Sequence, residues 1–287
     1  MRVILAVNPT ADRGRAAGAG AGLASRLADA GHEVEVARAA DADSLRDLVA
    51  RHLLDTPDRL VIAGGDGLVH ALLPAVAGTE VPIGIVPLGT GNDVARAFSL
   101  PTEPGPALQT ALGPWRTVDA IKVGDGWAAS VATAGFSGTV NARANRMGWP
   151  RGQGRYTVAT LIELPRLRPF PLSLVVDGVR TDLSCSLVAV GNTSLFGGGM
   201  AICPEARPDD GLLDVTVVQA VSPLTLARVF PRVFAGRHLQ HPAVRTFRGQ
   251  SVELLAEGVD LWADGEPAGP LPARLECVPA ALRIAAG

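Results

Sequence analysis

Two glycine-rich segments, each with an aspartate, hold the residues of this sequence whose types and spacing best suit chemistry. The first is Gly-Gly-Asp-Gly at 64–67, and the second is Pro-Leu-Gly-Thr-Gly-Asn-Asp at 87–93. Glycine lets a backbone approach a bulky anion closely and adopt positive φ without strain. A nearby carboxylate is a ligand of the kind that Mg²⁺ prefers. Together the segments predict a site for a nucleotide phosphate and a metal ion.

Each segment follows an apolar strand and precedes a helical pattern. Residues 60–63 and 83–86 predict buried strands, and residues 68–76 predict the helix after the first segment. In such a strand–loop–helix unit, the free N–H groups of the helix N-terminus point at the anion that the loop binds. Two such units in succession strengthen the prediction of a phosphate site.

The flanking elements place these loops in an α/β domain. Strands are expected at 3–7 and 32–37, with helices at 15–30 and 43–54. Because the strand runs are apolar on both faces, they predict a parallel sheet covered by helices. We therefore expect a Rossmann-like α/β nucleotide domain at 1–120.

The pattern changes after Pro114 to short alternating strands. Hairpin signals stand at 124–126 and 177–178, and helices are expected only near 156–167 and 223–234. This half predicts a mostly antiparallel, sandwich-like β domain at 121–278. The segment 279–287 is expected to return to the first domain.

Composition excludes several classes of protein. Hydrophobic residues make up 47% of the 287 residues and the formal net charge is −2, which predicts a real core and gives no sign of nucleic-acid binding. Lys122 is the only lysine. Neither G-x-x-x-x-G-K-[ST] nor a G-x-G-x-x-G after the first strand occurs, which disfavours P-loop kinases and Rossmann dehydrogenases.

The cysteines and the N-terminal segment carry no special signal. The three cysteines form no C-x-x-C pair, so neither a zinc site nor a disulfide framework is predicted. Residues 1–9 predict a first strand instead of a signal peptide. No uncharged apolar run approaches the ~18 residues of a membrane span. We expect a cytoplasmic protein without a transmembrane segment.

Further motifs join the two glycine segments in a fixed order along the chain. The full set adds Asn8-Pro9 with Gly14, Asn192 before the triple glycine at 197–199, Pro204 to 210–211, and Asp-Gly-Glu at 264–266. As a set they resemble the bacterial diacylglycerol and sphingosine kinase family of soluble lipid kinases, over essentially the whole chain. Residues 145–156 resemble its actinobacterial diacylglycerol kinases.

The resemblance implies a fold and a set of site residues. The first domain would be related to those of NAD kinases and phosphofructokinases, the cofactors would be ATP and Mg²⁺, and Glu266 would be the general base, with Asp66 the second catalytic residue. Metal ligands would be Asp66, Asp210 and Asp214. The nucleotide would be bound by Asn8, Thr10, Arg15, Gly64, Gly65, Asp66, Gly67, Gly89, Thr90, Asn92 and Asp93.

Some positions depart from the family's pattern or have simpler explanations. Leu68 and Ala71 stand where threonine and glutamate are common, and Ser137 stands where aspartate is common, so we keep Ser137 out of the metal set. Glu266 could also be an ordinary hairpin carboxylate, and Asp210 a turn residue before glycine.

The function implied is an ATP- and Mg²⁺-dependent lipid kinase at the inner face of a membrane, with diacylglycerol as the favoured substrate and phosphatidic acid as the product. Three alternatives stay open. The acceptor could be sphingosine, ceramide or monoacylglycerol, or a soluble molecule as in NAD kinases. The chain could also be a nucleotide-binding regulator without catalysis. A homodimer is left open, since no interface is identifiable from the sequence.

Overall fold

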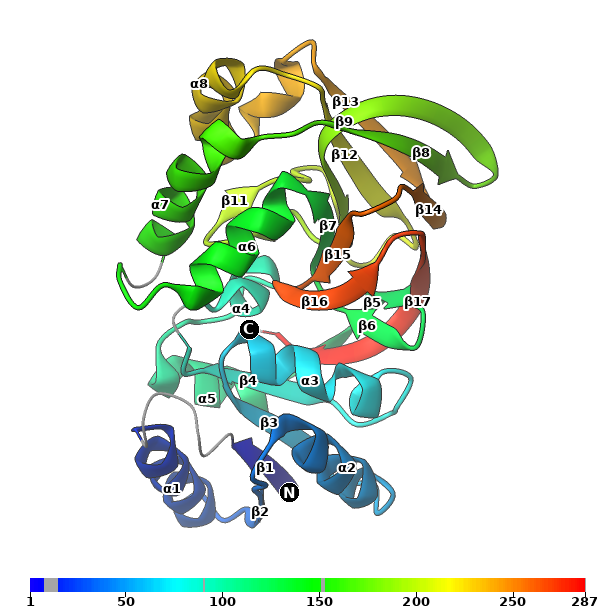
Figure 1. Ribbon diagram of the computed structural model, residues 1–287. Helices are drawn as coiled ribbons and strands as arrows, with labels where there is room; N and C mark the ends of the chain where they lie inside the picture. The colour runs from blue at the N-terminus through cyan, green and yellow to red at the C-terminus, as the bar shows by residue number, and fades with distance from the viewer. Residues whose placement is uncertain (8–14, 90, 151–152, 287) are drawn as a thin grey trace. The chain divides into compact units, whose positions relative to one another are not determined.

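The chain divides into two compact units (Figure 1). The computed structural model describes residues 1–7, 15–89, 91–150 and 153–286, with the backbone alone at 15–19 and 153. Unit 1 consists of Met1–Val118 with Ala280–Gly287, and unit 2 of Asp119–Pro279. The expected fold class, an α/β nucleotide-type half and a β-sandwich-like half, is confirmed.

Unit 1 is built on a parallel sheet. Its strands are β1 (Arg2–Val7), β2 (Glu33–Ala37), β3 (Arg59–Gly64) and β4 (Ile83–Pro87). They lie in the order β2-β1-β3-β4, and all neighbours are parallel. The end of β17 (Ala273–Ala285) adds a parallel strand beside β4, with Ile284 opposite Ile83.

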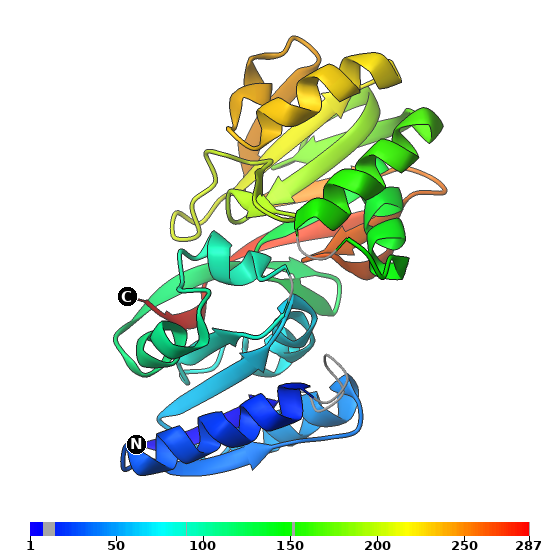
Figure 2. The ribbon, with the colours of Figure 1, turned by 90° about the vertical axis from the view of Figure 1, so that its left-hand side faces the viewer.

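Helices cover both faces of this sheet, which explains why its strands are apolar throughout. Successive residues of β1 illustrate the alternation: Val3 and Leu5 pack with residues of α1 and α5, whereas Ile4 is fully buried on the opposite face. Figure 2 shows α1 running along the sheet of unit 1. The helices are α1 (Arg15–Asp29), α2 (Ala42–Leu53), α3 (Asp66–Val76), α4 (Asp93–Ala97) and α5 (Pro104–Leu112).

Unit 2 is mostly antiparallel. Its main path runs β16-β15-β7-β9-β8-β14-β17, and β12 pairs with both β9 and β13. Leucines and valines from these strands form its largest core cluster. The strands are β5 (Trp115–Val123), β6 (Gly126–Ala128), β7 (Val131–Gly135), β8 (Phe170–Val176), β9 (Val179–Gly191), β10 (Leu195–Phe196), β11 (Met200–Ala201), β12 (Leu213–Gln219), β13 (Val244–Gly249), β14 (Ser251–Leu255), β15 (Asp260–Ala263) and β16 (Glu266–Pro270).

Unit 2 contains one more α-helix than the sequence pattern predicts. The helices are α6 (Phe136–Arg146), α7 (Gln153–Glu163), the 3₁₀ helix η2 (Leu164–Arg166), α8 (Pro223–Val233) and the 3₁₀ helix η3 (Arg237–Gln240). The unexpected one is α6, whose glycine and β-branched residues have low helix propensity. Packing compensates, because Phe136, Val140 and Ala144 share a core cluster with Ala159 of α7 and Leu226 of α8.

None of the described helices is both long and apolar enough to cross a bilayer.

The three cysteines all belong to unit 2, and each is a free thiol. Burial raises the pKa of Cys185, Cys203 and Cys277 from 9.0 to about 12, and Asp119 and Asp210 add to the shift at Cys277. Because the thiolate is the reactive form, native alkylation at pH 8 should be ~10³-fold slower than in the unfolded chain. Iodoacetamide labelling followed by mass spectrometry checks this, with labelling in guanidinium as the control. Rapid native labelling would contradict the expectation.

Candidate functional site

The two glycine segments meet at one edge of the unit 1 sheet. They follow the adjacent parallel strands β3 and β4, in which Gly64 lies opposite Pro87. The amide of Leu88 donates to the carbonyl of Gly64 at 2.9 Å. A Cβ atom added to Gly89 would lie 2.6 Å from the Cα of Gly65, so a side chain there would collide with backbone. The two segments therefore lie together, and they carry the following predicted residues: Gly64, Gly65, Asp66, Gly67, Gly89, Asn92 and Asp93.

Asp66 joins the two segments. It is the first residue of α3, and its Oδ1 accepts a hydrogen bond of 3.0 Å from the amide of Val94 at the start of α4. A Cβ atom on Gly91 would lie only 2.8 Å from Asp66 Oδ2. The half-buried carboxylate thus stabilises the second segment and also lies within the site.

Asn92 fixes the conformation of the second segment. Its φ is 55°, in the left-handed region that asparagine tolerates better than most residues. Its side chain accepts from the amide of Gly89 at 3.1 Å and donates to the same residue's carbonyl at 3.2 Å. Next to it, Asp93 lies 3.7 Å from Arg96, which also donates to the carbonyl of Gly91.

The chemistry of this site suits a phosphate with a cation. The N-terminal N–H groups of α3 and the helix dipole favour an anion. Asp66 would repel that anion unless a cation lay between them. Mg²⁺ usually takes one or two carboxylates and draws its other ligands from phosphate and water. The residues present therefore fit a Mg²⁺–phosphate group.

Leu68 stands where threonine is common in the family's pattern, and it packs in the core instead of offering a polar group. Its side chain is 5% exposed and belongs to the core of unit 1. A Cβ atom on Gly64 would lie 2.5 Å from its Cδ2, so Leu68 packs directly against that glycine. Leu68 therefore supports the loop from the core side.

Glu266 lies on a tight hairpin of unit 2. Asp264 and Gly265 connect β15 to β16 with φ values of 51° and 87°, and Glu266 is paired with Ala263. Positive φ at both central residues is typical of a type I′ turn. Glu266 is half-buried at the first position of β16. The backbone that carries the Glu266 carboxylate therefore has little conformational freedom.

Asp264 anchors the Glu266 hairpin, a role that the sequence pattern did not reveal. Its carboxylate accepts hydrogen bonds of 2.8 Å from the amides of Ala129 and Ser130, and a third from the Ser130 hydroxyl. Its own amide donates to the carbonyl of Val131 at 3.0 Å. The hairpin is therefore tied to the connection between β6 and β7.

Asn192 supports the connection between β6 and β7 to which Asp264 is bound. Its fully buried side chain donates to the carbonyls of Asp119 at 2.8 Å and Ala129 at 2.9 Å. Its amide donates to the carbonyl of Ser130 at 2.8 Å. The residues that hold Asp264 are thus themselves held by Asn192.

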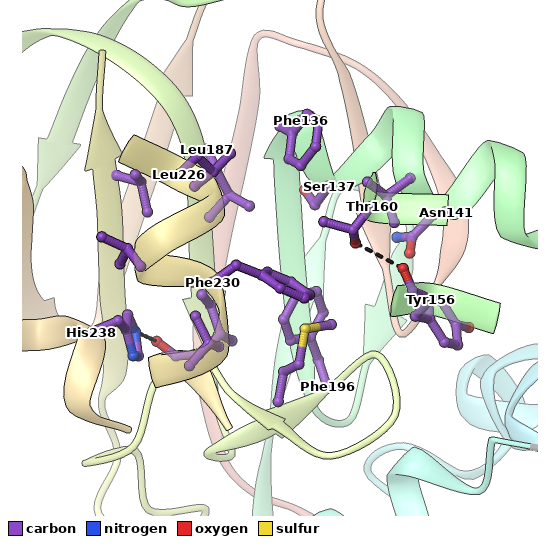
Figure 3. Close-up of a pocket in the computed structure, with 16 residues that line it drawn as sticks. Phe136, Ser137, Asn141, Tyr156, Thr160, Leu187, Phe196, Leu226, Phe230 and His238 are labelled. Carbon is purple, nitrogen blue, oxygen red and sulfur yellow. Dashed lines mark hydrogen bonds between the residues drawn. The ribbon is translucent and has the colours of Figure 1, made fainter. Parts of the chain in front are cut away.

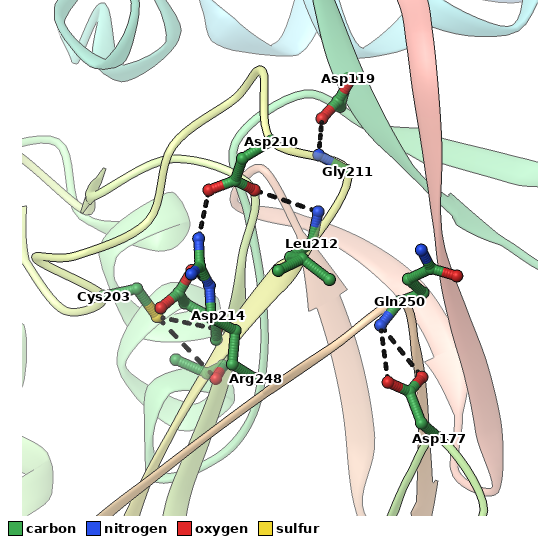
Figure 4. A network of polar contacts seen from close by, with 10 residues as sticks. Asp119, Asp177, Cys203, Asp210, Gly211, Leu212, Asp214, Arg248 and Gln250 are labelled. Carbon is green, nitrogen blue, oxygen red and sulfur yellow. Dashed lines mark hydrogen bonds and ion pairs between the residues drawn. The ribbon is translucent and has the colours of Figure 1, made fainter.

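The second predicted metal position, at Asp210 and Asp214, is occupied by an arginine (Figure 4). Arg248 forms ion pairs with both carboxylates, the one to Asp214 at 3.4 Å. Burial raises the pKa of Asp214 even though Arg248 opposes the shift. Nearby, Asp119 accepts from the amide of Gly211 at 2.8 Å. Within the described part of the chain, no group of three or more His, Cys, Asp or Glu side chains is placed to hold a metal.

Four of the predicted nucleotide-binding residues fall wholly or partly outside the described part of the chain. Asn8, Thr10 and Thr90 are outside the described residues, and so is the side chain of Arg15.

Unit 2 also contains an apolar cavity of about 60 Å³, which no motif of the sequence indicates (Figure 3). Most of the side chains that line it are apolar and come from α6, α7, α8 and the neighbouring strands. His238 is fully buried there, and burial lowers its pKa, which keeps the ring neutral. The lining includes Phe136, Val140, Tyr156, Leu187, Phe196, Met200, Leu226, Val229, Phe230 and Val233.

Comparison with known proteins extends over the whole chain. Residues 2–123 match the diacylglycerol kinase catalytic domain, and residues 130–286 match the YegS C-terminal NAD kinase beta sandwich-like domain. A protein of Mycobacterium tuberculosis named "Diacylglycerol kinase" is 42% identical over 99% of this chain and 94% of its own length. A protein of Xanthomonas campestris named "Probable lipid kinase YegS-like" is 34% identical over 82% of this chain and 81% of its own.

Solved structures agree on the fold. A diacylglycerol kinase from Bacillus anthracis superposes with a TM-score of 0.80 at 20% identity, covering 100% of this chain and 97% of that one. An NAD kinase from Archaeoglobus fulgidus, solved with ATP, gives a TM-score of 0.57 at 15% identity, covering 100% of this chain and 94% of the other. With both domain matches and the 42% identity, the chain belongs to the diacylglycerol kinase family of lipid kinases.

Proposed function

We propose that this protein transfers the terminal phosphoryl group of ATP to the hydroxyl group of diacylglycerol, giving phosphatidic acid and ADP. The extent of the match to the Mycobacterium tuberculosis protein supports the choice of substrate. The reaction would take place in the cytoplasm, during transient contact with the inner face of the membrane.

The glycine segments and Glu266 have separate roles in the proposed reaction. The backbone of the two glycine segments in unit 1 binds the phosphates. Glu266 of unit 2 accepts the proton of the lipid hydroxyl, the hydroxyl oxygen forms a bond to the terminal phosphorus, and the bond from that phosphorus to ADP breaks. Phosphoryl transfer depends chiefly on positioning and charge stabilisation, which fits a base on a tightly anchored hairpin.

Bound Mg²⁺ would neutralise negative charge on the phosphates, and Asp66 is the described residue best placed to hold it. We rank a metal position at Asp210 and Asp214 below the one at Asp66, because a metal there would compete with Arg248 for both carboxylates.

The apolar cavity of unit 2 is the observation that favours a lipid acceptor over a soluble one. Most of its lining is apolar, and it belongs to the same unit as Glu266. Such a lining suits hydrocarbon, because burial is worth about 25 cal/mol for each Å² of apolar surface removed from water. At about 60 Å³ the cavity would have to widen to admit a whole acyl chain. A polar acceptor such as NAD would leave its own polar groups unpaired there.

A panel of acceptors tests this proposal directly. The protein would be incubated with radiolabelled ATP and Mg²⁺, and with vesicles that contain diacylglycerol, sphingosine, ceramide or monoacylglycerol, or with NAD in solution. We expect labelled phosphatidic acid as the main product. Preferential labelling of NAD would overturn the lipid assignment, and ATP binding without any product would indicate a regulator.

Asp66 provides a prediction for the metal. Changing Asp66 to Asn keeps an oxygen that can accept from Val94 but removes the charge, so the fold should persist while use of Mg²⁺-ATP weakens. We expect the Mg²⁺ concentration for half-maximal activity to rise by about tenfold or more, consistent with the loss of one carboxylate ligand. Steady-state rates measured across a Mg²⁺ titration check this. Asp55→Asn, an exposed change elsewhere in unit 1, is the control, and an unaltered Mg²⁺ dependence of Asp66→Asn would remove Asp66 from the metal site.

A further inference from the structure

Exposed apolar side chains gather on the helical side of unit 2. Of the nine large apolar side chains exposed among the described residues, five belong to the segments around α7 and α8. The other four are Met1, Leu54, Trp115 and Val179, which are scattered over the chain. A cluster of this kind is more informative than single exposed residues. The five are Trp149, Leu161, Ile162, Leu224 and Phe234.

On α7 these side chains form a stripe at helical spacing. Val158, Leu161 and Ile162 of α7 stand at positions i, i+3 and i+4, with Leu161 58% and Ile162 40% exposed, and Pro165 of η2 follows at i+7. The opposite side of the helix, including Ala159, is buried. An apolar stripe normally faces the core. Here it faces away from the core.

The second helix continues this surface. Leu164 of η2 and Leu226 of α8 belong to one core cluster, so the two segments lie side by side. Both ribbon views show α6, α7 and α8 on the same side of the unit 2 sheet (Figures 1 and 2). The outward positions of α8 are Leu224, Arg228 and Arg232, all exposed. We call the exposed residues of α7, η2 and α8 the α7–α8 face.

The charge of this region differs sharply from that of the whole chain. Residues 127–176 contain six arginines and one acidic residue, and residues 215–252 contain five arginines and none, although the chain as a whole has a formal net charge of −2. The one acidic residue, Glu163, is buried in an ion pair with Arg143. The following arginines are exposed and form no ion pair within the described structure: Arg146, Arg228, Arg232 and Arg237. Arg166 and Arg168 are also exposed, and they line a hollow together with Glu257 and Asp260.

We propose that the α7–α8 face docks on the surface of an anionic lipid bilayer. The apolar stripe enters the boundary between headgroups and acyl chains, and the arginines contact lipid phosphates, as for interfacial amphipathic helices. This inference rests on the proposed function for the need to reach a bilayer. It also connects to the cavity, because the inward sides of the same helices line it through Tyr156 and Thr160 of α7 and Val229 of α8.

Vesicle binding tests the face without catalysis. The full chain would be sedimented, in the absence of ATP, with vesicles of phosphatidylglycerol or of phosphatidylcholine. One variant combines Leu161→Ser with Ile162→Ser, and another combines Arg228→Gln with Arg232→Gln. Matched controls are Val179→Ser, 70% exposed on the β8–β9 hairpin, and Arg51→Gln, exposed in unit 1.

Wild type and both controls should bind phosphatidylglycerol vesicles in preference to phosphatidylcholine. The arginine variant should bind about fivefold more weakly for each arginine removed, and the stripe variant at least about tenfold more weakly. Equal binding by either variant and wild type, or no preference of wild type for anionic vesicles, would overturn the proposal.

Phosphorylation of short-chain diacylglycerol in detergent micelles separates this inference from the proposed function. Both variants should keep wild-type rates there and lose activity on phosphatidylglycerol vesicles alone. If the variants also lose activity in micelles, these residues act in the fold or in the reaction, and the docking proposal is wrong. If wild type phosphorylates no lipid but the vesicle results hold, the proposed function fails and the docking face stands.

Discussion

Glu266→Gln is expected to lower kcat by about 10²–10⁴, which is the usual contribution of a general base. The amide has nearly the shape of the carboxylate but cannot accept the proton of the lipid hydroxyl. Because Glu266 is half-buried at the start of β16 and paired with Ala263, the substitution should leave the hairpin intact. Initial rates with diacylglycerol vesicles, circular dichroism and calorimetric titration of ATP make up the measurement.

The control for this prediction is Glu257→Gln, since Glu257 is exposed elsewhere in unit 2. That variant should retain wild-type kcat. ATP affinity should be the same in both variants and in wild type. Near-normal turnover of Glu266→Gln would show that Glu266 is not the base and would support the simpler explanation, a hairpin carboxylate.

Asp264→Ala should lower the free energy of unfolding by about 3–5 kcal/mol. The change removes three hydrogen bonds to a carboxylate and leaves the amides of Ala129 and Ser130 without this acceptor. Leaving a buried donor unsatisfied costs about 1–3 kcal/mol each. Urea unfolding followed by tryptophan fluorescence measures the effect, and the kcat of the folded fraction should fall because the Glu266 hairpin loses its anchor.

A neighbouring aspartate supplies the matched control. Asp260 lies on the same strand, β15, and is exposed, so Asp260→Ala should change stability by no more than about 0.5 kcal/mol. Asp264→Asn should recover part of the stability, because its amide oxygen can still accept one of the hydrogen bonds. If Asp264→Ala and Asp260→Ala unfold at the same urea concentration, the anchoring role of Asp264 is wrong.

Local pattern was enough to predict the fold class and the close approach of the two glycine segments. The strands of unit 1 are apolar on both faces, and they do form a parallel sheet with its loops at one edge. Parallel neighbours place the ends of β3 and β4 together, so Gly65 and Gly89 meet as their positions after two strands imply. The helix α6 was missed because its propensity is low and its stability comes from packing, which local sequence does not record.

Contacts between distant residues lay beyond sequence reasoning. Asp264 and Ser130 are 134 residues apart, and Asp66 and Val94 are 28 apart. A turn aspartate gives no local sign of which amides it will bind. The pairing of Arg248 with Asp210 and Asp214 was hidden for the same reason, since β13 brings the arginine alongside β12 only in the folded sheet. The apolar cavity likewise combines residues from several elements between Phe136 and His238.

The discontinuity of unit 1 has a consequence for synthesis on the ribosome. Residues 1–118 emerge first, but the strand that lies beside β4 is supplied by residues after 280. Until that segment leaves the exit tunnel, the backbone groups of β4 on that side stay unpaired. An unpaired strand edge of this kind promotes aggregation. Unit 2 is translated meanwhile as an uninterrupted insertion and can fold early. A chain truncated after Pro279 and released from the ribosome should therefore hold a folded unit 2 and an incomplete unit 1.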